Sequence, residues 1–312
     1  MILTNKHNLP EVLANFARAK RYDRGDAAFS ITQLINSPRI VAYEKRYAEQ
    51  IEQDLSDLMF SLLGNAVHAV LDSYSDQNNV ISEQRLFCHV NGFRISGQID
   101  RQVLVPGGRI IEDWKVTSAW AVMSEKIEWE HQLNAYAFLV RSTMSEGDVQ
   151  GLKINAIIRD FSRRQAEKVP GYPAAPVHQV DVPLWTFEQQ RDYIHARLAA
   201  HAQALMDEPP VCTPEERWEK APMVAIQKVG AKRAWKLVPT MEEAEPLLKA
   251  GMEAVLRPGE SVRCLNYCKV RKFCDFGKSL GESDAESDQQ KNECRQNHST
   301  CSTHHRQNPL CT

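Results

Sequence analysis

Three consecutive segments between residues 84 and 116 predict an antiparallel meander, and no other feature constrains the fold of this chain as strongly. Residues 84–90 alternate in part between apolar and polar side chains and end at Asn91-Gly92, a dipeptide that favours a two-residue hairpin turn. Residues 93–105 are the predicted return strand. A Pro-Gly-Gly turn follows, and residues 109–116 are rich in β-branched side chains, which predicts a third strand.

The meander brings two carboxylates and one amine to a common face. Side chains alternate along a strand, so Asp113 and Lys115 share one face of the third strand, and Asp100 on the neighbouring strand can face the same pair. Carboxylates are preferred ligands of hard cations, and a lysine beside them can hold or help deprotonate an attacking water. Taken alone, the Asp-x-Lys triplet is more typical of an ordinary surface ion pair.

Two predicted helices flank the meander and carry further polar side chains. Residues 55–74 have apolar side chains at helical spacing, with His68 beside the apolar stripe. Residues 125–142 predict another helix, on which Gln132 and Tyr136 project from one face because they are four residues apart. Each feature alone is typical of a core or boundary contact without chemistry.

In order along the chain, these segments resemble the motif series of the PD-(D/E)xK nuclease superfamily, and specifically its RecB-like exonuclease branch. The resemblance covers about residues 28–275, and residues 30–34 are similar to the short segment that opens many of these domains. The motifs that carry the resemblance are Gly64-x3-His68, Gly97-x2-Asp100, Asp113-x-Lys115 and Gln132-x3-Tyr136.

The resemblance implies an α/β fold: a restriction-endonuclease-like core with a central mixed β-sheet flanked by helices, plus a cysteine-stapled C-terminal cap. It also implies that Mg²⁺ or Mn²⁺ is bound by a set of ligands and that other residues serve the reaction. The implied ligands are His68, Asp100, Asp113 and the carbonyl of Trp114; Lys115 would assist the water, and Gln132 and Tyr136 would contact the DNA backbone or steady the lysine. Glu83, ahead of the meander, is either a further site residue or an ordinary surface residue.

A cysteine cluster near residue 270 forms the second constellation. Cys264, Cys268 and Cys274 are close enough in sequence to converge on one soft metal or cluster, and Cys212 is the best candidate for a fourth ligand. Several RecB-like nucleases carry a four-cysteine iron–sulfur cluster, and this run is similar to a phage-encoded version. The resemblance therefore implies a [4Fe–4S] cluster, with zinc as the alternative.

Composition agrees with an intracellular protein that binds nucleic acid through a local surface. No segment is apolar over the ~18 residues that a membrane span needs, and eight cysteines in such a chain favour metal ligation over disulfides. The formal net charge of −2 requires any DNA contact to use a local basic channel. The basic candidates are residues 159–164, 228–236 and 269–272.

The chain divides into four predicted parts. We expect an N-terminal helical arm over residues 1–27, the nuclease core over 28–210, a cysteine-cluster cap with a small α/β insert over 211–280, and a disordered tail over 281–312. The insert is predicted as strand, turn, strand and a helix over residues 241–256. The tail cannot build a core because it has almost no apolar residues.

These observations predict a metal-dependent DNA nuclease, in the version we prefer an exonuclease acting on single-stranded DNA or free ends in recombination, repair or phage replication. The expected location is the cytoplasm of a bacterium or of a phage-infected host cell, with a recombinase or helicase as a candidate partner and no membrane. The alternatives are a non-catalytic DNA-binding scaffold and an iron–sulfur redox-sensing regulator.

Overall fold

The computed structural model describes residues 2–19, 25–74, 78–124, 126–144 and 148–281. The predicted disordered tail lies outside the described residues except for Gly281. The chain forms two compact units, Met1–Cys212 and Thr213–Thr312. Within the described residues, no helix combines the length and the apolarity needed to cross a membrane.

The first unit is built around a six-stranded mixed sheet. The strands of the whole unit, of which β1 and β3 form a separate pair, are β1 (Ile2–Thr4), β2 (Phe29–Ser30), β3 (Glu52–Asp54), β4 (Val80–Val90), β5 (Phe93–Val105), β6 (Gly108–Thr117), β7 (Asp148–Ile158) and β8 (Val177–Val182). Its helices are α1 (Glu11–Arg18), α2 (Ile31–Leu34), α3 (Pro38–Arg46), the 3₁₀ helix η1 (Leu55–Leu58), α4 (Met59–Asp72), α5 (Ala119–Met123), α6 (Ile127–Thr143), α7 (Arg163–Ala166) and α8 (Phe187–Met206).

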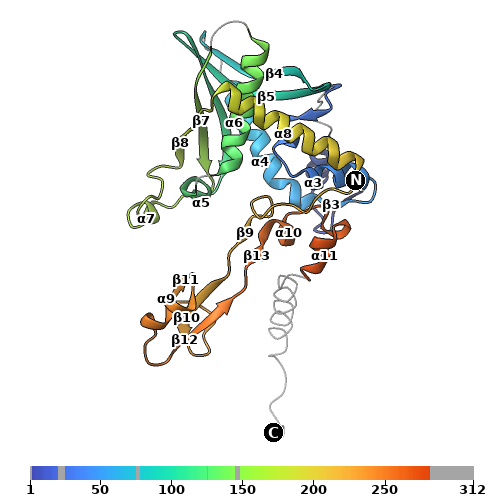
Figure 1. The fold of residues 1–312 in the computed structure, drawn as a ribbon. Coiled ribbons are helices and arrows are strands. Elements are labelled where there is room, and N and C mark those ends of the chain that lie inside the picture. Colours follow the sequence, from blue (N-terminus) through green and yellow to red (C-terminus); the bar gives the residue numbers. More distant parts are fainter. Residues whose placement is uncertain (1, 20–24, 75–77, 125, 145–147, 282–312) are drawn as a thin grey trace. The chain divides into compact units, whose positions relative to one another are not determined.

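The predicted meander is confirmed as β4, β5 and β6 (Figure 1). Asn91 and Gly92 both have positive φ angles, 49° and 80°, so the two-residue turn has the twist that matches a hairpin. The sheet runs in the order β2-β5-β6-β7-β8, with β4 also paired to β5. The β2–β5 and β6–β7 pairs are parallel and the others antiparallel, which confirms the predicted central mixed sheet.

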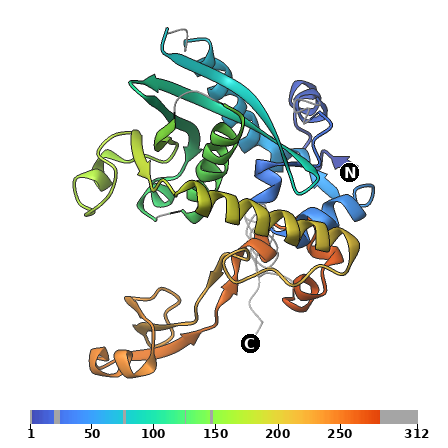
Figure 2. The same cartoon turned by 45° about the horizontal axis from the view of Figure 1, so that its top comes forward.

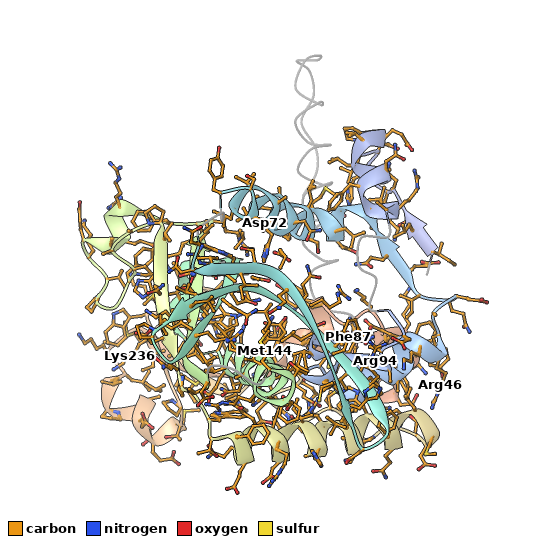
Figure 3. All side chains as sticks on the ribbon, turned by 90° about the horizontal axis from the view of Figure 1, so that it is seen from above. Arg46, Asp72, Phe87, Arg94, Met144 and Lys236 are labelled. Atoms are coloured by element: carbon orange, nitrogen blue, oxygen red, sulfur yellow. The ribbon has the colours of Figure 1, made fainter. Side chains whose placement is uncertain are left out.

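Helices cover both faces of this sheet. Figure 3 shows α4, with Asp72 near its end, on one side of β4 and β5, and Met144 with α6 on the other. Helix α6 is buried over most of its length, from Trp129 to Val140, because it packs against β4, β5, β6 and β7. Helix α8 runs beside α6 (Figure 2). The hydrophobic core of the unit therefore lies between α6 and the sheet.

The start of helix α8 follows from local sequence. Helix α8 begins with the predicted capping box: the Thr186 hydroxyl accepts a hydrogen bond from the Gln189 backbone at 3.2 Å, and the Gln189 side chain accepts one from the Thr186 backbone at 2.9 Å. In the predicted N-terminal helical arm, α1 is preceded by strand β1, which pairs in parallel with β3.

The second unit contains the small insert and the cysteine segment. Its elements are β9 (Glu219–Lys220), β10 (Met223–Lys228), β11 (Lys236–Val238), α9 (Met241–Ala244), η2 (Glu245–Leu247), β12 (Met252–Arg257), β13 (Glu260–Ser261), α10 (Val262–Asn266), η3 (Arg271–Phe273) and α11 (Asp275–Ser279). Strands β11, β10 and β12 form an antiparallel sheet in that order.

The predicted helix over residues 241–256 is wrong in its second half. Helical structure ends at Leu247, one residue after Pro246, and Gly251 takes a positive φ of 77° before β12 begins. Residues 252–257 instead pair with β10, so the apolar residues of this segment that we assigned to a helix belong to a strand.

Candidate functional site

A cavity of about 550 Å³ in the first unit gathers the residues that the motif series singles out. The predicted residues in its lining are His68, Asp100, Asp113, Lys115, Gln132 and Tyr136. They come from α4, β5, β6 and α6, and Glu83 of β4 joins them. Residues 30–32, in the predicted opening segment, line the same cavity. Side chains separated by up to 106 positions thus meet at one place.

The cavity lies where two strands part along one edge of β5. Strand β4 pairs with β5 along nearly its whole length, so β2 and β6 must share the opposite edge. Strand β2 pairs with residues 95–96 and β6 with residues 101–105. Residues 97–100 lie between these ladders and face the cavity through Gly97, Gln98 and Asp100.

Where the pairing of β5 with β6 ends, the Asp100 side chain accepts a backbone hydrogen bond from β6. The last pair between β5 and β6 joins Arg101 to Glu112, so the next pair in register would be Asp100 and Asp113. The strands do not pair there; the Trp114 backbone N–H instead donates to Asp100 Oδ2 at 2.9 Å. This bond fixes the Asp100 carboxylate beside Asp113 and gives the backbone of Trp114 a role in positioning it.

Asp113 is buried and held from two sides. Its side chain is 3% exposed, Oδ1 accepts a hydrogen bond from Gln132 Nε2 at 3.0 Å, and Lys115 Nζ lies 2.6 Å from Oδ2. The Lys115 contact is an ion pair that lacks hydrogen-bond geometry, so Oδ2 is a buried oxygen without a hydrogen bond. Gln132 also donates to the Tyr136 hydroxyl at 3.1 Å. The structure thus gives Gln132 a contact with the aspartate. The two roles that we expected for it, a contact with the DNA backbone or steadying of the lysine, stay predictions.

His68, Glu83 and Asp100 form the cluster best suited to a metal ion. Among the described residues, they alone make a group of three or more His, Cys, Asp or Glu side chains whose ligand atoms all lie within 4.8 Å of one another. His68 Nδ1 is 3.7 Å from Glu83 Oε1 and 3.6 Å from Asp100 Oδ2. Asp113 stands outside this group, tied to Gln132 and Lys115.

Glu83 is the residue whose place the motif series left open, and the hairpin register could have found it. A two-residue turn at Asn91-Gly92 pairs Val90 with Phe93, and continuing that register sets Glu83 opposite Asp100. Glu83 has a positive φ of 50°, which is unusual for a residue with a long side chain, and the ladder skips this one position. The local irregularity lies beside the cavity, where such strain is most often found.

The charges in the cavity shift one another's protonation. Burial, followed by the nearby Asp113 charge, raises the pKa of Asp100 to about 7. The interaction with Glu83, more than the charges of Asp100 and Asp113, raises the pKa of His68 above its usual value. The pKa of Glu83 is lowered in turn, chiefly by His68. Closely spaced carboxylates in a buried site are the environment in which a divalent cation replaces protons.

The two motif glycines differ in their steric role. A Cβ on Gly97 would lie 2.6 Å from Leu139 Cδ1 and 3.0 Å from Tyr136 Cε1, so the absent side chain lets α6 approach β5 closely. At Gly64, ahead of His68, an added Cβ would meet nothing within 4 Å. Gly97 is thus required by packing, whereas the described structure gives no steric reason for Gly64.

Two of the four candidate cysteine ligands are buried. Cys264 and Cys274 are each 8% exposed, Cys264 in α10 and Cys274 just before α11, and Cys268 lies between them. Cys212, the last residue of the first unit, has its sulfur 3.1 Å from the Ser37 hydroxyl. None of these four cysteines forms a disulfide. Their joint ligation of one metal or cluster stays a prediction.

Comparison with known proteins gives one family match. The model of the PD-(D/E)XK nuclease superfamily matches residues 76–275, which is more than half of the chain. No curated protein matches the chain. Among solved structures, the protein SSO0001 is 18% identical, with a TM-score of 0.42 over 67% of this chain and 87% of that one. A candidate exonuclease from Eubacterium rectale is 12% identical, with a TM-score of 0.31 over 54% of this chain and 63% of its own.

Proposed function

The chain belongs to the PD-(D/E)XK nuclease superfamily, and on that premise we propose that it is a Mg²⁺- or Mn²⁺-dependent deoxyribonuclease that degrades DNA from its ends. The observation that carries the proposal is the single cavity in which Asp100 and Asp113 lie beside Lys115. We assign it to the RecB-like exonuclease branch because His68 and the pair Gln132 and Tyr136 line the same cavity.

The donor set in the cavity fits a hard divalent cation. Carboxylate oxygens are preferred ligands of Mg²⁺ and Mn²⁺, and imidazole is compatible with the latter. His68, Glu83 and Asp100 have their ligand atoms within 4.8 Å of one another. The buried Asp113 Oδ2 accepts no hydrogen bond and lies 2.6 Å from Lys115 Nζ, so its lone pairs can also be shared with a cation. We propose these four residues as ligands, together with the Trp114 carbonyl.

The remaining residues would orient and transfer protons. A bound cation supplies neutralisation of the negative charge that builds up on the phosphodiester oxygens. Lys115, 27% exposed at its side chain, would reach both Asp113 and the attacking water and so hold that water in line with the phosphorus. Gln132 would keep the Asp113 carboxylate in place, and the Trp114 N–H would do the same for Asp100.

A substrate with no ends tests the exonuclease part of the proposal. Purified protein with Mg²⁺ or Mn²⁺ is incubated with circular and with linearised DNA of one sequence, each in single- and double-stranded form. We expect loss of linear DNA with short products from the first time points, while circles persist. Rapid nicking of circles would show an endonuclease instead. Action at ends would suit recombination, repair or phage replication, with a recombinase or helicase as the partner that exposes them.

Metal binding is expected to release protons below neutral pH. The pKa of Asp100 is about 7 without metal and that of His68 is raised, so at pH 6 both groups hold protons that the cation must displace. Calorimetry at pH 6 in two buffers of different ionisation enthalpy should give about one to two protons released per binding event, and fewer at pH 8. The apparent affinity should fall by about tenfold per pH unit below 7 for each proton released, which is about ten- to a hundredfold for one to two protons.

Asp100→Asn is the control for that measurement, since it removes one of the two titrating groups and should reduce the proton release. Buffer-independent heats at pH 6 would contradict the account. The effect on stability is the opposite of the usual carboxylate case. The pKa of Asp100 in the folded protein lies above the ordinary value of 3.8, so its stabilising contribution is full below pH 3.8 and is lost as pH rises through 7. Metal-free protein should therefore gain from this group as pH falls from 7 to 4.

We propose that the cysteines hold an iron–sulfur cluster. The support is the close spacing of Cys264, Cys268 and Cys274 in the sequence. Anaerobically purified protein should be brown, with about four irons and four sulfides per chain for a cuboidal cluster. Cys268→Ser should lose them, whereas Cys88→Ser, a half-buried cysteine of β4, should keep them. If the protein is colourless and holds one tightly bound zinc ion, the cysteines form a zinc site and not an iron–sulfur cluster.

A further inference from the structure

The small sheet of the second unit carries a basic loop that the proposed reaction does not use. Strands β11, β10 and β12 pack over a core that includes Val224, Ile226 and Val238. The chain between β10 and β11, with the last residue of β10 and the first of β11, spans residues 228–236, which we call the basic loop. The loop therefore stands on a sheet with a hydrophobic core of its own.

The cations of the basic loop have no partners. It contains Lys228, Lys232, Arg233 and Lys236 and no acidic residue, in a chain whose formal net charge is −2. All four side chains are exposed. No ion pair or hydrogen bond of their side chains occurs within the described residues, whereas Arg217 of the same unit is paired with Glu219. Four unpaired cations in nine residues create a local positive potential that an anionic ligand would neutralise.

One acidic and one basic residue of β12, Glu253 and Arg257, form hydrogen bonds with the backbone of the loop. Glu253 Oε1 accepts from the Gly230 N–H at 3.1 Å, and an Arg257 guanidinium nitrogen donates to the Lys232 carbonyl at 3.0 Å. These bonds hold the loop in one conformation without neutralising its side chains. A preformed loop loses little conformational entropy when a ligand binds, which favours affinity.

An exposed aromatic ring lies among these cations. Trp235, between Arg233 and Lys236 in sequence, is 56% exposed. Lys249 Nζ lies 5.8 Å from the centroid of its ring system, at the outer limit of a cation–π contact. Nonspecific binding of single-stranded nucleic acid combines basic side chains along the backbone with an aromatic face on which a base can stack. The basic loop presents both within nine residues.

We propose that the basic loop binds a single DNA strand, with Lys232, Arg233 and Lys236 on consecutive phosphates and Trp235 stacked on a base. The proposal rests on the proposed nuclease function for the identity of the polymer. It adds a DNA-binding surface outside the cavity, which would hold the strand between successive cleavage events. The exposed indole favours a single strand over a duplex, because duplex bases are already stacked on one another.

The test is binding of the full-length protein to fluorescent DNA in EDTA, where no cleavage occurs. The variant with Lys232→Ala, Arg233→Ala and Lys236→Ala should bind single strands at least about tenfold more weakly, and the slope of log affinity against log salt should fall by about 2. The matched control exchanges the same positions as Lys232→Arg, Arg233→Lys and Lys236→Arg, which keeps every charge and should bind like wild type. Thermal unfolding of each variant checks the fold.

Variants at Trp235 distinguish the contribution of base stacking to binding from that of charge. Trp235→Ala should weaken single-strand binding by about tenfold and leave the salt slope and duplex binding unchanged, while Trp235→Phe should keep most of the affinity. Wild-type affinity and slope in the triple alanine variant would overturn the proposal. The proposal would also be overturned if the triple alanine variant lost affinity for duplex DNA alone. The same holds if it lost affinity only for phosphatidylserine vesicles, tested in a parallel binding assay.

The outcomes keep the two proposals apart. If the triple alanine variant binds like wild type while Asp113→Asn stops cleavage, the proposed role of the basic loop is wrong and the proposed nuclease function is supported. If wild-type protein cleaves no DNA with either metal, but the triple alanine variant binds DNA more weakly than wild type, the proposed nuclease function is wrong and the proposed role of the basic loop is supported. If both stand, the triple alanine variant should still cleave, but release the strand more often between cuts.

Discussion

Asp113→Asn is expected to reduce DNA cleavage by on the order of 10³-fold, because the oxygen that it replaces is the buried Oδ2 that has no hydrogen bond. The substitution keeps an oxygen that can accept the Gln132 hydrogen bond, now 3.0 Å from Asp113 Oδ1, and nearly the same volume. It removes the charge that faces Lys115 and the proposed cation. The fold should persist while the metal-dependent step is lost.

Initial rates with labelled linear DNA at saturating Mg²⁺ measure this effect. Glu112→Gln is the matched control: it removes one carboxylate charge from the adjacent residue of β6, where Glu112 pairs with Arg101 at 3.0 Å. That variant should cleave at a rate close to wild type. An Asp113→Asn protein with full activity and a wild-type thermal transition would show that Asp113 is not a ligand.

Lys115→Ala is expected to lower the cleavage rate by about 10²- to 10⁴-fold, the range for losing a positioned proton-transfer group. Lys115 Nζ lies 2.6 Å from Asp113 Oδ2, so the ammonium is held at the edge of the cavity next to the proposed cation. In contrast to Asp113→Asn, this variant should still bind Mg²⁺, because no proposed ligand is removed. Rates and calorimetry on one preparation separate the two effects.

Lys153→Ala provides the comparison for Lys115→Ala. Lys153 lies on the neighbouring strand β7 with nearly the same side-chain exposure, 28% against 27%, but pairs with Asp181 outside the cavity. Its loss should leave cleavage unchanged. Equal losses in the two variants would mean that Lys115 acts through the stability of the sheet and not through chemistry.

The site could be predicted largely because its residues lie at positions fixed by short-range rules. The turn at Asn91-Gly92 sets the register of β4 and β5, and the alternation of side chains sets Asp113 and Lys115 on one face. The same register places Glu83 opposite Asp100, so this residue was within reach of the sequence. The helical spacing of Gln132 and Tyr136 likewise predicted that they project from one face, and there they form a hydrogen bond of 3.1 Å.

The features that sequence reasoning missed depend on long-range packing. The parting of β2 and β6 along β5 depends on strands from distant parts of the chain, and no local pattern marks it. The contact of Gln132 with Asp113 depends on how closely α6 approaches the sheet at Gly97. The helix predicted up to residue 256 failed because apolar residues at irregular spacing fit a short strand as well as a helix.

We propose that the cavity formed by β4, β5, β6, α4 and α6 cleaves DNA with the help of a bound metal ion. The most direct measurement incubates wild-type and Lys115→Ala protein with end-labelled linear DNA in Mg²⁺, in Mn²⁺ and in EDTA. We expect wild-type protein to shorten the DNA with either metal, no shortening in EDTA, and almost none with Lys115→Ala. DNA that stays intact with wild-type protein under both metals, while the protein still binds it, would contradict the account and leave a DNA-binding scaffold.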